Sequence, residues 1–182
     1  MQYDKPQFTY ELGSPGTAKA SFAYHDVSLD FELSNICNPL GDMLSGLVSL
    51  LASPSYLWGE EGTSHIEWYN DSDSFFWQLT LRSKDTLNIR IVKSAGFFDE
   101  GETELLNADC VCNEFIYCII CELDTMIKRT GMLNYSQQWQ KAEFPITYFL
   151  FLKKVLIDNG RWHQGGRKQC DILSDEVLLL LA

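Results

Sequence analysis

Carboxylates gather in the predicted loops and turns of the middle of the chain, and they are the side chains most able to do chemistry there. They are Glu60, Glu61, Asp71, Asp73, Asp85, Asp99, Glu100, Glu102 and Glu104. Paired carboxylates act as general acids and bases or bind divalent cations. The run 70–73 is rich in oxygen atoms but lacks the glycine and the closing glutamate of a calcium-binding loop. Solvated turns explain these acids most simply, and a partner-binding surface is the functional alternative.

Four aromatic residues lie among these acids: Trp58, Tyr69, Phe97 and Phe98. Aromatic side chains surrounded by charged ones are typical of the core and rim of a protein interface. We therefore predict a partner-binding surface, called here the acidic-aromatic set. Its members are Trp58, Glu60, Glu61, Tyr69, Asp71, Asp73, Phe97, Phe98, Asp99, Glu100, Glu102 and Glu104.

Four cysteines that lie close together in the sequence raise the question of a zinc site: Cys110, Cys112, Cys118 and Cys121. A helix predicted from about Asp109 would carry all four. Cys110 and Cys121 would then lie about 16 Å apart along its axis, whereas zinc-bound sulfurs lie about 2.3 Å from one ion. The sequence therefore predicts free thiols, no metal and no cofactor. A zinc site would require a helix that starts later.

The three histidines, His25, His65 and His163, are scattered along the chain. A catalytic triad needs a nucleophile, a base and an orienting group that converge in space, and no serine here has the sequence of a nucleophile elbow. No catalytic residue is therefore predicted.

One segment is basic rather than acidic, and it runs from Lys153 to Lys168. The residues Gly165-Gly166-Arg167-Lys168 lack the spacing of a phosphate-binding P-loop, and no hydroxyl residue follows the lysine. A basic loop that could hold an acidic partner segment is the better interpretation.

Strict alternation predicts that His65 to Lys93 is a three-stranded meander around which the chain is organised. Phe75, Trp77, Leu79 and Leu81 are apolar at every second position, and Gln78, Thr80 and Arg82 lie between them. Leu87, Ile89 and Ile91 repeat the pattern after the turn residues 83–85, with Asn88 and Arg90 on the other face. Period two indicates a sheet with one buried face and one hydrated face.

Other segments of the chain supply further strands and the helices. Residues 5–12 and 19–33 are predicted as strands, with a tight turn or bulge at His25-Asp26. Helices are predicted from Asn38-Pro39 to Ser53, from about Asp109 to Arg129, and after Phe144-Pro145. Residues 97–104 are predicted as an acidic connection and 174–181 as a short element that docks on the core.

We therefore predict an α+β fold. It consists of a mostly antiparallel twisted sheet of about five strands, with the meander 65–93 at its centre and three helices packed on one face. At 182 residues the chain is expected to form a single globular domain over 1–182.

The net charge of −11 is unevenly distributed along the chain. Residues 1–127 hold 20 acidic and 6 basic side chains, a net charge of −14, whereas residues 128–182 carry a net charge of +3. An acidic field repels nucleic acid and anionic membranes and attracts basic partners, although solubility alone also explains it. The first residues lack the features of a signal peptide, and no apolar run is long enough to span a membrane. We expect a cytoplasmic protein with reduced cysteines.

The layout of the chain resembles that of immunity proteins from bacterial polymorphic-toxin systems, the contact-dependent growth inhibition type in particular. The resemblance covers residues 20–157. It rests on the strand pairs, Asn38-Pro39-Leu40-Gly41-Asp42-Met43-Leu44, Trp58-Gly59-Glu60-Glu61 before the meander, and Trp139 followed by Phe144-Pro145. Such proteins share no catalytic residues. The resemblance implies a cytoplasmic protein that binds one toxin domain, often a basic nuclease, and blocks its active site.

Three functions remain open from the sequence. The first is an immunity protein that neutralises a cognate toxin domain through the acidic-aromatic set. The second is a small cytoplasmic enzyme whose site is built from acidic loops and one histidine. The third is a structural or adaptor subunit, which differs from the first only in its partner. A deep pocket with convergent polar groups favours the enzyme, and a shallow acidic face favours the binding protein.

Overall fold

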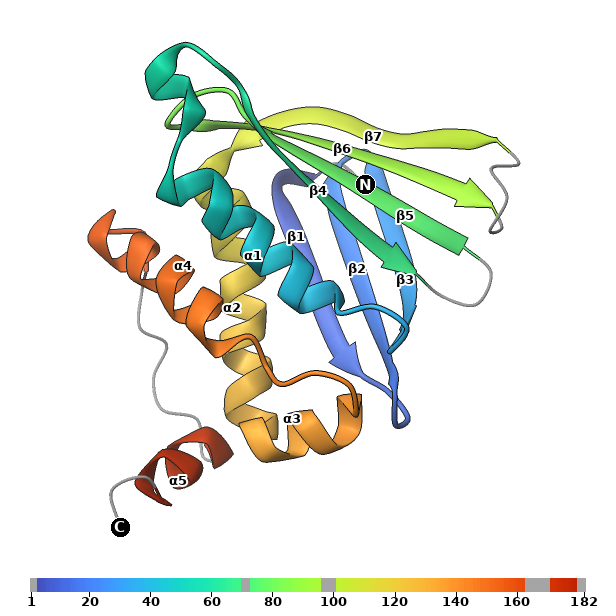
Figure 1. The fold of residues 1–182 in the computed structure, drawn as a ribbon, viewed down its shortest axis with the longest axis vertical. Coiled ribbons are helices and arrows are strands. Elements are labelled where there is room, and N and C mark those ends of the chain that lie inside the picture. The colour runs from blue at the N-terminus through green and yellow to red at the C-terminus, as the bar shows by residue number, and fades with distance from the viewer. Residues whose placement is uncertain (1–2, 70–72, 96–100, 163–170, 180–182) are drawn as a thin grey trace.

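The computed structural model describes residues 3–69, 73–95, 101–162 and 171–179, which form an α+β fold (Figure 1). The strands in these ranges are β1 (Tyr3–Leu12), β2 (Thr17–His25), β3 (Val27–Ser34), β4 (Gly62–Tyr69), β5 (Asp73–Leu81), β6 (Thr86–Ala95) and β7 (Glu102–Val111). The helices are α1 (Pro39–Ala52), a 3-10 helix η1 (Ser55–Trp58), α2 (Cys112–Thr130), α3 (Met132–Trp139), α4 (Ile146–Asp158) and α5 (Ile172–Leu179). The predicted α+β class is confirmed.

The strands form two antiparallel sheets rather than one, so the predicted sheet of about five strands is wrong in its detail. One sheet has the order β1-β2-β3 and the other the order β4-β5-β6-β7. Five α-helices occur in the described ranges rather than three, because α3 and α5 add to the predicted ones. Alternation shows which residues face a core, but it does not show which strand edges pair, because pairing depends on distant parts of the chain.

The meander itself is confirmed, with Phe75, Trp77, Leu79 and Leu81 each 6% exposed or less. Its turn at 83–85 is closed by the backbone N–H of Thr86, which donates to Ser83 Oγ at 3.1 Å. The predicted change of register at His25-Asp26 is a tight turn, because β2 ends at His25 and β3 begins at Val27.

Residues 102–111 form strand β7, so the predicted acidic connection is wrong over 102–104, and the predicted helix start at about Asp109 is also wrong. Residues 97–100 of that connection lie outside the described residues. Leu106, Ala108 and Cys110 pair with Ile91, Ile89 and Leu87 of β6. Their alternation with polar Asn107 and Asp109 is the strand pattern. The helix α2 begins at Cys112, so Cys110 lies outside it.

The apolar faces of the two sheets pack on each other through aromatic rings. The ring of Phe31 lies 4.9 Å from that of Phe75 and 5.2 Å from that of Trp68, both nearly perpendicular to it. Phe22 meets Trp77 at 5.4 Å in the same edge-on manner. Such geometry is favourable for aromatic quadrupoles. A second sheet therefore covers the meander together with helices, where the prediction had helices alone.

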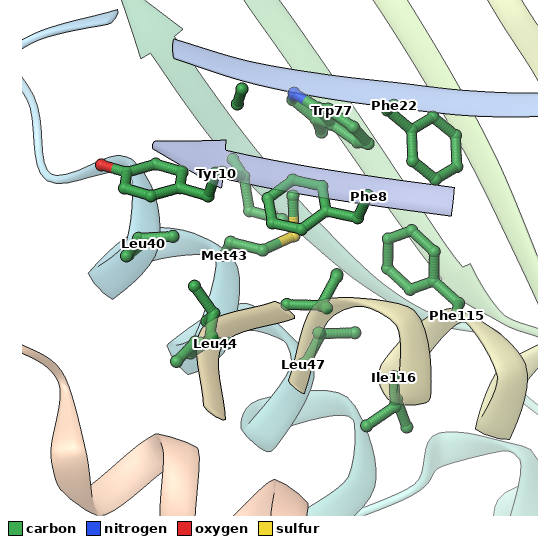
Figure 2. Close-up of a cluster of buried hydrophobic side chains, with 14 of the residues drawn as sticks. Phe8, Tyr10, Phe22, Leu40, Met43, Leu44, Leu47, Trp77, Phe115 and Ile116 are labelled. Carbon is green, nitrogen blue, oxygen red and sulfur yellow. The ribbon is translucent and has the colours of Figure 1, made fainter. Parts of the chain in front are cut away.

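Helices α1 and α2 complete the core beside β4 and β1 (Figures 1 and 2). Figure 2 shows the side chains on β1 facing those on α1: Phe8, Tyr10, Leu40, Met43, Leu44 and Leu47. The predicted N-cap is confirmed, because Asn38 Oδ1 accepts the N–H of Gly41 at 3.3 Å. Trp68 Nε1 donates to the carbonyl of Pro39 at 3.1 Å and ties the start of α1 to β4.

Helices α3, α4 and α5 pack around α2. Asp124 of α2 forms ion pairs with Lys128 at 2.7 Å and with Lys153 of α4. Glu176 of α5 accepts the N–H groups of Met132 and Leu133, the first residues of α3. In the part of the chain that the structure describes, no helix is long and apolar enough to cross a membrane.

Candidate functional site

The four-stranded sheet separates the acidic-aromatic set into two groups. Trp58, Glu60 and Glu61 precede β4, whereas Tyr69 ends it. Eight extended residues span about 26 Å, so these two groups lie at opposite ends of the sheet.

The remaining described members lie at the same end as Tyr69. Asp73 begins β5, and Glu102 and Glu104 begin β7. Five members lie outside the described residues: Asp71, Phe97, Phe98, Asp99 and Glu100.

The face of this sheet that is turned away from β1–β3, called here the outer face, runs between the two groups. Its charged residues are Glu67, Arg82, Arg90, Glu102, Glu104 and Asp109. In Figure 1 the helices gather on the left and lower sides of the view, whereas β5, β6 and β7 extend to the right. The outer face contains the predicted members Glu102, Glu104 and Tyr69.

Both arginines of the outer face are held by carboxylates. Arg82 pairs with Asp109 at 2.9 Å and more distantly with Glu61 at 3.8 Å. Arg90 pairs with Glu104 at 2.7 Å. These contacts neutralise the charges of both arginines.

Polar residues between the ion pairs are less hydrated than the alternation predicts. Asn88 Nδ2 donates to Asp109 Oδ1 at 2.8 Å, and Asn88 is 9% exposed. Thr80, at 6% exposed, lies opposite Thr63 with their hydroxyl oxygens 3.2 Å apart.

The most exposed aromatic side chain borders one end of the outer face. Trp58 is 85% exposed and its neighbour Leu57 is 68% exposed. Gly59, with φ of 77°, ends η1 in a left-handed conformation and leads to Glu60 and Glu61. Because Glu61 reaches Arg82, the exposed apolar pair is continuous with the charged layer.

The other end is more strongly tied into the sheet. The Tyr69 hydroxyl donates to the Glu67 carboxylate, and this hydrogen bond raises the pKa of Tyr69 to about 12. Asp73 pairs with Lys93 at 3.0 Å. Glu102 is exposed, and no described cation pairs with it.

A groove of about 360 Å³ lies between α1 and the free edge of β4, and a histidine, two acidic residues and three serines are among the residues that line it. It is lined by Asp42, Ser45, Gly46, Ser49, Ser64, His65, Ile66 and Glu67. Burial raises the pKa of Asp42, and the nearby Glu67 carboxylate adds to the effect. Ser45 Oγ and Ser49 Oγ donate to backbone carbonyls of their own helix at 3.1 and 2.9 Å. None of the described serines or carboxylates hydrogen-bonds to His65, so the groove lacks the geometry of a triad.

A larger cavity of about 500 Å³ lies between β1 and α2. Lys5 and Glu114 form an ion pair of 2.8 Å at its wall. Cys118 also lines it, and burial raises the pKa of this thiol, which therefore stays protonated at neutral pH. No histidine is among the described residues that line this cavity.

The cysteines do not come together as metal ligands, even though α2 starts later than predicted. Burial raises the pKa of both Cys110 and Cys112 to about 12. Within the described ranges, no group of three or more His, Cys, Asp or Glu residues could hold a metal ion. The five cysteines of those ranges are free thiols.

The basic region is partly neutralised by the fold. Lys153 pairs with Asp124 and lies 4.6 Å from the ring centre of Trp162. Lys154 pairs with Asp158 at 2.6 Å. The segment 163–170, with its glycines and two basic residues, lies outside the described residues.

Comparison with protein-family models, with curated protein sequences and with solved structures found no match. A functional proposal therefore rests on the residues, their geometry and the resemblance in layout.

Sequence reasoning missed several members of the outer face, notably Glu67, Phe76 and Asp109. The signal for Glu67 and Phe76 was present, because both occupy the outward positions of strands whose inward positions were identified. Asp109 was missed because residues 102–111 were not recognised as a strand.

Proposed function

We propose that this chain is an immunity protein that binds a cognate basic toxin domain and neutralises it. Its partner is the C-terminal domain of the protein encoded directly upstream. The observation that carries the proposal is Trp58, a tryptophan 85% exposed beside Leu57, Glu60 and Glu61. A large ring in water next to carboxylates is the composition of an interface hot spot with an acidic rim.

Electrostatics supports the same proposal. A net charge of −11 accelerates the encounter with a basic domain and disfavours nucleic acid as a direct partner. The resemblance in layout to immunity proteins agrees with this. The protein acts in the cytoplasm, where free thiols are the normal state of cysteine.

An enzymatic function has less support in the geometry. The groove beside β4 contains His65, but its serines donate to their own helix backbone. The larger cavity has the size of a small-molecule site, but the described residues that line it include no histidine to activate either of its thiols, Cys118 and Cys121.

Growth of cells that co-express the upstream-encoded domain tests the proposal. The wild-type protein should restore growth, and Trp58→Ala should restore it poorly while remaining soluble. Tyr148→Ala is the matched control, because Tyr148 is an aromatic residue 40% exposed on α4, away from η1. Failure of the wild-type protein to protect, or an upstream gene that encodes no toxic domain, contradicts the proposal.

A further inference from the structure

The outer face has a small apolar centre, in which the side chain of Phe76 is half-buried and that of Val92 is 4% exposed. Phe76 of β5 and Val92 of β6 are cross-strand partners. The same row of the sheet continues to Glu67 opposite Phe76 and to Glu104 opposite Val92. The row therefore reads carboxylate, phenyl, isopropyl, carboxylate from β4 to β7.

The negative charge of this row is not cancelled evenly. Glu104 is neutralised by Arg90. Among the described residues, Glu67 accepts a hydrogen bond from the Tyr69 hydroxyl alone, and no cation pairs with Glu67 or with Glu102. Glu102 lies two residues further along β7, opposite Ser94 of β6. Since neighbouring strands lie about 4.8 Å apart, β4 and β7 are separated by about 14 Å. Glu102 is also offset from the row of Glu67 by two residues, about 7 Å along the strand, so the two uncompensated carboxylates flank the apolar pair about 16 Å apart.

The outer face of the other sheet lacks this arrangement. Its central strand β2 presents Ser21 and the small side chain of Ala23 there, opposite Asp30 and Ser28 of β3. Exposed acids occur on both sheets, but a phenyl ring between acids occurs only on the four-stranded one in the described chain.

From this arrangement we infer that the outer face of β4–β7 is a docking surface for the basic toxin domain, with Phe76 as its anchor. The inference rests on the proposed function and names the surface used. The fitting partner presents an apolar side chain between two Lys or Arg side chains about 16 Å apart, because these match the phenyl ring and the two carboxylates.

The size of the face shows that it acts together with η1. Four strands spaced at about 4.8 Å and about 26 Å long present roughly 500 Å². A stable interface needs about 800 Å² from each partner. The partner therefore extends over the edge of the sheet to Trp58 and Leu57, to which Glu61 and Arg82 connect the face.

The affinity of purified variants for the purified upstream-encoded domain tests the inference by calorimetry. Glu67→Lys/Glu102→Lys and Phe76→Thr should each raise the Kd by at least about tenfold. The control Asp30→Lys/Glu32→Lys makes the same change in charge at exposed positions of β3 and should leave the Kd within about threefold. Thermal unfolding should show that all variants fold.

Each result distinguishes the inference from the proposed function. Equal loss of affinity in the β3 control indicates net charge alone and overturns the docking surface. Unchanged affinity in both outer-face variants also overturns it, while wild-type binding keeps the proposed function. Absence of wild-type binding overturns both. If the outer-face variants instead convert a wild-type dimer to a monomer, the surface binds a second copy, and the inference is wrong.

Discussion

Trp58 and Trp77 are the same residue type in opposite environments, and the difference identifies which tryptophan is available to a partner. Trp77 is 1% exposed and packs on Phe22 and Phe31, whereas Trp58 is 85% exposed. The sequence distinguishes them only through context: Trp77 lies in a strict alternation and Trp58 beside Gly59 in a loop.

Truncation of these two tryptophans should therefore have unequal effects on stability. Trp77→Ala should lower the free energy of unfolding by about 3–5 kcal/mol, because it leaves a cavity between the sheets. Trp58→Ala should change it by less than about 0.5 kcal/mol. Urea denaturation measures both values. A large loss of stability in Trp58→Ala would show that this ring packs on the protein.

Cys110 and Cys112 make the protein sensitive to alkaline pH. Burial raises the pKa of each thiol from its ordinary value of 9.0 to about 12. The folded state therefore holds these protons more tightly than the unfolded state. Their contribution to stability is complete below pH 9 and is lost as the pH rises from 9 to about 12.

The free energy of unfolding should thus fall between pH 9 and 12, and it should fall less steeply in Cys110→Ala/Cys112→Ala. Chemical denaturation at a series of pH values measures both slopes. Equal slopes for the two proteins would contradict the burial of these thiols, because other titrating groups are common to both.

Helix α1 depends on a local arrangement that its sequence predicts. Asn38 caps the helix, and its amide lies against Gly41, where a Cβ atom would come within 2.1 Å of Asn38 Nδ2. Asn38→Ala should cost about 1 kcal/mol of stability. Gly41→Ala should be unfavourable in the wild type but stabilising by up to about 1 kcal/mol in Asn38→Ala, because alanine favours helix once the clash is gone.

A double-mutant cycle by urea denaturation measures this coupling. Additive effects of the two substitutions would show that Gly41 does not make room for the cap.

Helix α5 is attached to α3 through one carboxylate. Glu176 accepts two N–H groups at the start of α3, and none of the residues of α5 is fully buried. Glu176→Ala should accelerate hydrogen exchange at the amides of Met132 and Leu133, because both lose their acceptor. Asp175→Ala, at an exposed neighbouring position, is the control. Unchanged exchange in Glu176→Ala would show that other contacts hold the two helices together.

At the scale of the molecule, locally encoded features were predictable and the pairing of distant segments was not. The alternation of Phe75 to Leu81 and the cap at Asn38 act over a few residues, so they predict β5 and α1. The division of the strands into the sheets β1–β3 and β4–β7 depends on which strand edges pair. No short segment of the sequence determines that pairing.

The same distinction applies to the candidate site. Trp58, Glu60 and Glu61 lie around Gly59 in a segment that the sequence predicts as a loop, and loops lie on the surface. All three residues are exposed in the structure. The placement of Tyr69 and Glu102 at the far end of the sheet follows from strand direction, which composition does not reveal. Phe76 was overlooked because an aromatic residue at an outward position looks like part of a continuous apolar run.

Binding of the purified protein to the purified upstream-encoded domain, measured by biolayer interferometry over a range of salt concentrations, tests the central claim most directly. The acidic surface predicts specific binding with an association rate that falls by at least about tenfold between 20 and 500 mM salt, because ions screen steering charges. The dissociation rate should change much less, since the aromatic contacts are insensitive to salt. Absence of binding at low salt, or an association rate independent of salt, would contradict an immunity protein that recognises a basic toxin domain.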